Sequence, residues 1–468
     1  MTLIVVLLLV FGYLLIATGH LTGVSKAAIA MFIGTAGWVV YICWGADFVM
    51  SQHPHEYTEF LAGETPSSDA VKFFIYDSIF LKYVGRAASI VMFLLATMTI
   101  IEILNNNGCF DFITEWIRTR NSKRLLWTIT LATFILSANL DNLTTATMML
   151  VIMHNIVRSR RQRMLIGAAI VLAANCGGCF TVIGDPIGLL LWGDGAVTAT
   201  NFSMYLALPA IVAWVIPTLL INRMLPSRLD TEWSAPPYRG DDTNLNRWQR
   251  FVMLIVGIGG LWFIPTFHNI TKLSPFLGAL CVLSVLWVVN EAFNRKLNDS
   301  DQMAQRRIPR AIQYGTIQQM LFVMGIMLGM GVMTETGVLG DISAWIDYNI
   351  HNIWLVGVLS GFLSSLVDTF TIAITDISLY PVVQNDVVGV WLDSDYLENF
   401  LLNGAYWKVI AFSTAVGGCL LSVGSTSGLA LMKMEHVKLS WYLRTLTPKV
   451  LLGFGIGLAV LYIETLIL

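Results

Sequence analysis

Apolar runs long enough to cross a lipid bilayer recur along the whole chain, and this feature constrains the fold more than any other. A hydrocarbon core of about 30 Å needs about 20 helical residues to span it. Only 12% of the 468 residues are charged and the mean hydropathy is +0.69, which is too apolar for a soluble surface. The sequence therefore predicts an all-α polytopic membrane protein. We expect helices at about 2–19, 25–49, 86–105, 203–223, 250–267, 275–293, 315–333 and 449–468.

Basic residues gather in short segments between the apolar runs and set the orientation of the chain. By the positive-inside rule these segments face the cytoplasm. The loops 51–68 and 384–398 carry several acidic residues and no lysine or arginine, so they fit the outer face. We therefore expect both termini outside, in the inner (plasma) membrane of a bacterium. The basic segments are Arg118–Arg124, Arg158–Arg163, Arg223–Arg228, Arg295–Lys296 and Arg306–Arg310.

The segment 125–157 has basic clusters at both ends and the polar pair Asp141-Asn142 at its centre. Each arm of about 15 residues makes about 22 Å of helix, which falls short of the hydrocarbon core. Because both ends belong to the cytoplasmic side, we expect a re-entrant hairpin with its tip at mid-membrane. Two short full spans are the alternative.

The second half of the chain repeats three landmarks of the first half in the same order. The run 136–141 corresponds to 363–368, the glycine-rich run 177–184 corresponds to 417–424, and Glu102 corresponds to Glu335. The second hairpin, at about 352–383, is flanked by acidic residues and should enter from the opposite face. Inverted repeats of this kind are typical of secondary transporters. The predicted units are N-terminal helices with the outer loop (1–84), a first repeat (85–225), a cytoplasmic linker (226–250), a second repeat (251–448) and a C-terminal helix (449–468).

Each repeat also contains a long apolar run that is interrupted at its centre. In the first, at about 164–200, Gly184, Pro186 and Gly188 fall in the interruption, and in the second, at about 406–436, Gly424 and Gly428 do. Proline lacks a backbone donor and glycine loosens the backbone, so we expect both helices to unwind there. Unwound backbone exposes carbonyl groups that can ligate a cation.

Carboxylates, amides and hydroxyls gather at these interruptions and hairpin tips, and they are the hard oxygen ligands that sodium prefers. Burial in a low dielectric favours the protonated form of a carboxyl group, so one acid can accept either a proton or a sodium ion. The net charge of −2 gives no excess of basic residues for binding nucleic acid. We also expect no cofactor. The predicted ion- and proton-binding residues are Asp141, Asn142, Thr144, Asn175, Asp185, Asp368, Thr369, Ser425 and Ser427, with sodium at Asp141, Asn142, Asp185 and Asp368. Structural or proton-binding roles are expected for Glu102, Glu335, Asp376 and His154.

Four segments together resemble the NhaD family of sodium/proton antiporters, within the ion transporter superfamily. They are 98–102, 140–145, 175–188 and 417–435, and the similarity covers about 85–200 and 315–468. The resemblance implies exchange of Na⁺, with Li⁺ as an alternative cation, for H⁺, and so a role in pH homeostasis. It also implies a scaffold domain, a transport domain that moves like an elevator, and a homodimer. It carries ion-site roles over to Asp141, Asn142, Thr144, Asn175, Asp185, Asp368 and Ser425.

The second hairpin departs from the pattern of that family, which usually has Asp-Asn at the tip. Here Asp368 is followed by Thr369, and Asp376 adds an acid further along. These changes leave the preference between sodium and lithium, and the coupling ratio, open.

Two other functions compete with cation exchange. An anion transporter of the same fold, for a dicarboxylate or arsenite, would avoid carboxylates at the helix breaks, and three aspartates argue against it. An intramembrane aspartyl protease would need Gly-x-Gly-Asp, but Val182 stands where the first glycine belongs. A protease would also leave the second repeat unexplained, so we expect a transporter and not an enzyme.

Overall fold

The described part of the chain is helical throughout, with two isolated bridges and no β-strand. The computed structural model describes residues 2–62, 65–117, 119–229, 245–294, 314–383 and 394–467. Within these ranges eight helices are long and apolar enough to cross a membrane. The prediction of an all-α polytopic membrane protein is therefore confirmed. Arg118, the basic segments 295–296 and 306–310, and most of 226–250 and 384–398 lie outside the described residues.

In the described part of the chain, seven of the eight predicted helices correspond to helices of spanning length, and α11 (Arg160–Cys179), at the start of the first predicted broken helix, is the eighth. The N-terminal helix α1 (Thr2–Ala17) has 16 residues and is shorter than the others. The eight longer ones are α3 (Lys26–Trp44), α6–η1–α7 (Ser68–Phe74, Ile75–Phe80, Leu81–Asn106), α11 (Arg160–Cys179), α13 (Ala199–Asn222), α14–η2–α15 (Arg247–Leu254, Ile255–Gly259, Gly260–Thr271), α16 (Pro275–Phe293), α18 (Tyr314–Glu335) and α27 (Thr447–Ile467).

One predicted span begins much earlier than expected. The helix expected at 86–105 is continuous from Ser68 to Asn106, a length of 39 residues or about 58 Å. Ser67 caps its start by accepting a hydrogen bond from the backbone N–H of Ala70. No proline or glycine interrupts 68–84, so the charged residues there lie on a helix that extends past the apolar core.

The remaining short helices connect these spans. The expected outer loop 51–68 contains all of α5 and ends where the long helix begins. The connecting helices are α2 (Gly19–Thr22), α4 (Ala46–Gln52), α5 (Pro54–Leu61), α8 (Asp111–Trp116), α19 (Val338–Asn349), α23 (Ser394–Leu397), η5 (Glu398–Phe400) and α26 (Leu439–Thr445).

Both predicted hairpins form as helix–turn–helix pairs. The first consists of α9 (Ser122–Ser137) and α10 (Asn142–Ile156), and the second of α20 (Ile353–Leu366) and α21 (Thr369–Leu379). Each arm has 16 residues or fewer. Arms this short fall below the roughly 20 residues of a full span.

Both predicted helix breaks are present, slightly before their expected positions. Helix α11 ends at Cys179 and α12 (Pro186–Gly193) begins at Pro186, while α24 (Ala405–Gly417) is followed by α25 (Thr426–Glu435). Pro186 therefore starts α12, at a position where a proline costs no hydrogen bond.

Gly188 and Gly428 lie inside helices rather than in the unwound segments. Their role is close packing, because a Cβ atom on Gly188 would lie 2.9 Å from the Thr181 carbonyl oxygen. A Cβ on Gly428 would meet the carbonyl oxygen of Ser422.

The two halves share a specific contact between hairpin and broken helix. Ser137 Oγ donates to the Ala174 carbonyl at 2.6 Å, and Ser364 Oγ donates to the Thr414 carbonyl at 2.7 Å. Ser137 and Ser364 occupy matching positions in the runs 136–141 and 363–368, and Ala174 and Thr414 each lie three residues before the paired glycine-rich runs. Each hairpin is thereby fixed against its own broken helix.

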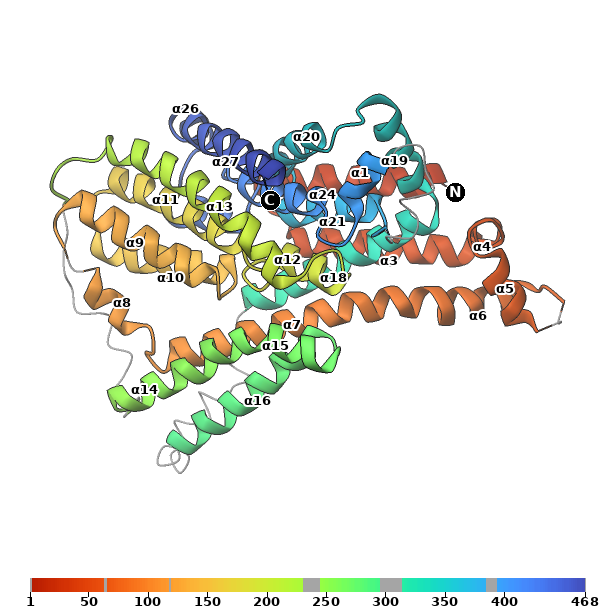
Figure 1. Cartoon of the computed structure of the whole chain (residues 1–468), viewed down its shortest axis with the longest axis horizontal. Helices are drawn as coiled ribbons and strands as arrows, with labels where there is room; N and C mark the ends of the chain where they lie inside the picture. Colours follow the sequence, from red (N-terminus) through yellow and green to blue (C-terminus); the bar gives the residue numbers. More distant parts are fainter. Residues whose placement is uncertain are drawn as a thin grey trace.

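Figure 1 shows α9, α10, α11 and α13 lying together, and α7 lying beside α14 and α16. The hairpins and broken helices pack on one another and on α13 and α27, whereas α3 packs on α18, and α7 on α16 and α18. Helices α3 and α18 approach closely, since a Cβ on Gly34 would lie 2.6 Å from the Gly325 carbonyl oxygen. This contact positions the start of α3, and with it Lys26, beside the second hairpin.

Candidate functional site

Four of the residues singled out from the sequence cap helix N-termini at the hairpin tips and breaks. Asp141, Asp185, Asp368 and Ser425 each accept a hydrogen bond, at 3.0 or 3.1 Å, from a backbone N–H in the first turn of the following helix. Short polar side chains favour this position because the first N–H groups of a helix lack partners. The positive ends of four helix dipoles therefore face three carboxylates and one hydroxyl.

A buried network of side chains joins the two breaks. Asn142 Nδ2 donates to Asp185 Oδ2 at 2.8 Å and lies 3.5 Å from Asn175 Oδ1. Asn175 Nδ2 donates to Ser427 Oγ at 2.8 Å, and the Oγ atoms of Ser427 and Ser425 are 3.3 Å apart. All five side chains are less than a tenth exposed. The fold thus brings together residues from both halves that the sequence named separately.

Asp141 lies at the first hairpin tip with uncharged partners. Its Oδ2 accepts hydrogen bonds from the backbone N and Oγ1 of Thr144, at 3.0 and 3.2 Å. Its Oδ1 faces Nε2 of Gln319 on α18 at 3.4 Å. Gln319 Oε1 is buried and has no hydrogen-bond partner among the described residues. A buried oxygen that accepts no hydrogen bond and lies next to a carboxylate is suited to act as a ligand of a cation.

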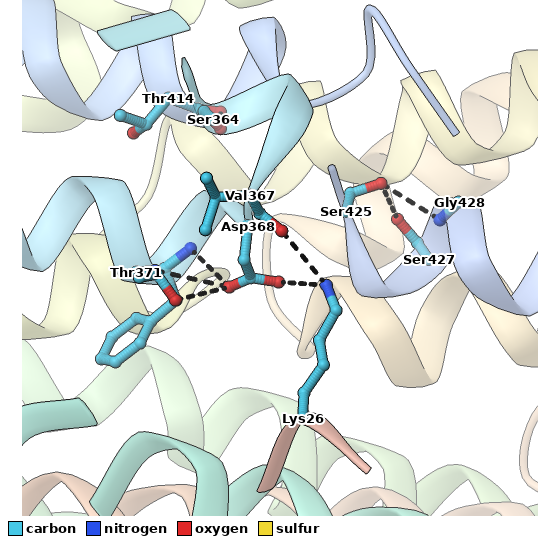
Figure 2. Close-up of polar contacts among 10 residues, drawn as sticks. Lys26, Ser364, Val367, Asp368, Thr371, Thr414, Ser425, Ser427 and Gly428 are labelled. Atoms are coloured by element: carbon cyan, nitrogen blue, oxygen red, sulfur yellow. Dashed lines mark hydrogen bonds and ion pairs between the residues drawn. The ribbon is translucent and has the colours of Figure 1, made fainter. Parts of the chain in front are cut away.

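Asp368 lies at the second hairpin tip and has a charged partner (Figure 2). Its Oδ1 is 3.1 Å from Lys26 Nζ, and Nζ is also 3.5 Å from the Val367 carbonyl. Its Oδ2 accepts from the backbone N–H groups of Phe370 and Thr371. Asp368 is fully buried, and the ammonium group of Lys26 lies in position to balance its charge.

The neighbours of Asp368 on α21 have different surroundings. Thr369 donates its backbone N–H to the Gly424 carbonyl at 3.0 Å, which fixes the second tip to the second break. Asp376 is buried, and its Oδ2 has no hydrogen-bond partner among the described residues.

Glu335 and His154 are held in ionic clusters apart from this network. Glu335 accepts a hydrogen bond from Tyr83 Oη at 2.7 Å and lies 2.8 Å from His53 Nε2. His154 Nδ1 lies 2.7 Å from Glu435 Oε1, and Glu435 also pairs with Arg163 at 2.8 Å. Glu102 is half-buried in α7.

Sequence reasoning missed Lys26 and Gln319. Lys26 stands at the start of a predicted span, where a lysine is expected to face the membrane interface. The only local signal was the shortness of α1, whose 16 residues fall below the roughly 20 of a full span. Gln319 stands in a predicted span without any motif.

The described residues contain no group of three or more histidine, cysteine, aspartate or glutamate side chains that could hold a metal ion. The network instead mixes carboxylate, amide and hydroxyl oxygens. Such a set is suited to a weakly held alkali cation carried as substrate and not to a resident transition metal.

Residues 1–391 match the family described as citrate transporter (CitMHS). The chain belongs to this family. The expectation of a transporter rather than an enzyme is confirmed by this membership.

Three relatives of this chain are named as antiporters. Sodium/proton antiporter 1 of Arabidopsis thaliana is 31% identical over 80% of this chain, which spans 62% of that relative's length. Sodium/proton antiporter 2 of the same plant is 28% identical, with 97% of each chain covered. The Na⁺/H⁺ antiporter NhaD of Vibrio cholerae is 27% identical over 79% of this chain and 77% of its own. The predicted resemblance to NhaD antiporters is confirmed.

The fold of this chain is similar to that of a solved transporter. The crystal structure of YdaH from Alcanivorax borkumensis matches with a TM-score of 0.53 and 13% identity, over 91% of this chain and 96% of that one. At this identity the similarity supports the fold alone.

Proposed function

We propose that this protein is a secondary active transporter that exchanges Na⁺ for H⁺ across a membrane by alternating access. The observation that carries the proposal is the pair of buried carboxylates Asp141 and Asp185, at a hairpin tip and a helix break. Among the described residues, no lysine, arginine or histidine forms an ion pair with either of them. The antiporter names of the relatives point to the same exchange.

A buried carboxylate without a basic partner needs a cation or a proton. An uncompensated charge inside a membrane protein costs several kcal/mol, and either ligand removes that cost. Asp141, Asn142, Thr144, Asn175 and Asp185 supply carboxylate, amide and hydroxyl oxygens for sodium. Since proton and sodium neutralise the same acids, they compete, and competition at a site that opens to each side in turn produces exchange. Lithium would be accepted by the same oxygens.

The description of the family as citrate transporters, and the four helix N-termini at the site, favour an anion as the second candidate. A citrate trianion would need several basic side chains. Three of the four N-termini are already capped by aspartates, and the lysine at the second tip is paired with Asp368. A dicarboxylate or arsenite anion would meet the same three carboxylates.

The movement we propose is of the elevator type, built on two inverted repeats. The hairpins and broken helices with α13 and α27 would form the transport domain. Helices α3, α7, α16 and α18 would form the scaffold. The packing of the hairpins and broken helices on one another and on α13 and α27, and of α18 on α3 and α7, supports this division. The linker at 226–250 would join the halves, and the assembly would be a homodimer.

The orientation we propose follows the basic segments, with both termini outside a bacterial plasma membrane. The bridge between Asn121 and Arg228 supports it, since it joins the loops before α9 and after α13 that carry two of the basic clusters. Arg163 and Arg160 likewise gather around the end of α25.

The test is exchange in proteoliposomes that contain a pH-sensitive dye and an imposed proton gradient. Sodium or lithium added to wild type should dissipate the gradient, and potassium, citrate, succinate and arsenite should not. Asp141→Asn should abolish the response. Asp341→Asn, which removes an exposed acid on α19, is the matched control and should respond like wild type. Transport of an anion without any response to sodium would overturn the proposal.

A further inference from the structure

The two hairpin tips are built alike and differ in one partner. Asp141 and Asp368 each use Oδ2 to cap the following helix, and each turns Oδ1 toward a side chain from another element. For Asp141 that side chain is the neutral amide of Gln319, at 3.4 Å. For Asp368 it is the ammonium group of Lys26, at 3.1 Å. The same carboxylate position therefore has an uncharged partner in the first half and a cation in the second.

The ammonium group stands where a bound cation would stand. Lys26 Nζ is within 3.5 Å of both the Asp368 carboxylate and the Val367 backbone carbonyl, so it contacts the two kinds of oxygen that a sodium ion takes at a helix break (Figure 2). Asp368 is fully buried and the Lys26 side chain is 16% exposed.

Charge balance decides whether a second cation could enter. The Asp368 carboxylate and the Lys26 ammonium together carry no net charge. A sodium ion added beside them would leave one uncompensated positive charge in a buried place, which costs several kcal/mol. Around Asp141 and Asp185 no ion pair with a basic side chain exists among the described residues, so sodium there reduces the charge.

The position of Lys26 is fixed by its helix. Ser25 Oγ accepts a hydrogen bond from Gln318 Nε2 on α18 at 3.3 Å, directly before Lys26. The close contact of Gly34 with Gly325 holds the rest of α3 on α18. The ammonium group therefore reaches Asp368 from a helix outside the hairpin.

We propose that Lys26 is a tethered cation that occupies the cation position of the second half, so that sodium binds only at the acids of the first half. This rests on the proposed function for the identity of the transported cation, and it names the specificity-determining residue of the second site. The chain then binds one sodium ion per cycle, and Asp368 contributes no sodium ligand in wild type.

The experiment is equilibrium binding of ²²Na⁺ to the purified full-length protein in detergent, with the number of bound ions per chain as readout. Wild type should bind about one ion with a Hill coefficient near 1. Lys26→Met should leave the Asp368 carboxylate without its ammonium partner and raise the number of bound sodium ions to about two. Lys26→Arg should restore one. Lys82→Met, which removes an exposed lysine on α7, is the matched control and should leave the number at one.

A second set of variants keeps the test decisive if Lys26→Met fails to fold. Asp368→Asn and the double variant Lys26→Met/Asp368→Asn should both bind about one ion, because the second site has lost its carboxylate. If the Lys26–Asp368 ion pair were merely structural, Lys26→Met would still bind about one sodium ion per chain. That result overturns the inference. Two ions in wild type, or fewer ions in Asp368→Asn than in wild type, also overturn it while the proposed exchange stands. Absence of any sodium binding and of exchange in wild type would overturn the proposed function first.

Discussion

Asn142 donates a hydrogen bond from Nδ2 to Oδ2 of Asp185 over 2.8 Å, and this contact joins the tip of the first hairpin to the first helix break. Both side chains are buried, and the second carboxylate oxygen of Asp185 caps α12. The amide therefore orients one of the two acids that we assign to sodium.

Asn142→Ala should weaken sodium binding more than it weakens folding. Loss of a hydrogen bond to a buried charged group costs about 1.5–3 kcal/mol, which corresponds to about a 10- to 100-fold rise in the sodium concentration at half-maximal exchange. The measurement is sodium-dependent dissipation of a proton gradient in proteoliposomes. Asn349→Ala, on the exposed face of α19, is the control and should match wild type. An unchanged sodium dependence in Asn142→Ala would show that the amide is not part of the site.

Gly184→Ala should disturb the first helix break, because the added Cβ atom has no room there. A Cβ there would lie 2.5 Å from the Ser137 carbonyl oxygen and 2.9 Å from Gly178, which no rotamer change can relieve. We expect a lower melting temperature and loss of exchange. Gly340→Ala is the matched control, because nothing lies within 4 Å of its Cβ position. Equal melting temperatures for the two variants would contradict the packing of break on hairpin.

Glu435→Gln should destabilise the protein at the end of α25. Glu435 is buried, and its carboxylate pairs with both Arg163 and His154. Replacing the carboxylate by a neutral amide leaves Arg163 without its anionic partner. Removing one partner of a buried ion pair costs about 3–5 kcal/mol. A fall in the thermal unfolding temperature in detergent is the expected result. Glu398→Gln, at an exposed acid, should leave this temperature unchanged.

Cysteine labelling should report the orientation of the chain. Glu59→Cys on α5 should react with a membrane-impermeant maleimide in intact cells, and Arg120→Cys should react only after permeabilisation. Background from Cys109, in the loop after α7, should be low. Burial raises the pKa of its thiol to about 12, so its reactive thiolate is scarce at pH 8 and appears only as the pH approaches that value. Labelling of Arg120→Cys in intact cells would reverse the proposed topology.

The sequence determined the features of this protein that depend on local chemistry. Hydrophobic length predicted the spans, and the short polar side chains Asp141, Asp185, Asp368 and Ser425 stand where helices must begin, because a helix start leaves N–H groups that such side chains satisfy. One predicted span was placed too late in the chain, because the helix expected at 86–105 already starts at Ser68, where Ser67 caps it.

Only the tertiary structure decided what each acid faces. Asp141 and Asp368 are indistinguishable as helix caps in the sequence. Their difference comes from Gln319, 178 residues away from Asp141, and from Lys26, 342 residues away from Asp368. Contacts at such separations depend on how α3, α18 and the hairpins pack, and no local pattern records that packing. The sequence alone therefore determined where acidic side chains stand at helix starts in the apolar part of the chain. The packing of distant helices decided which of those acids has a basic side chain as its partner.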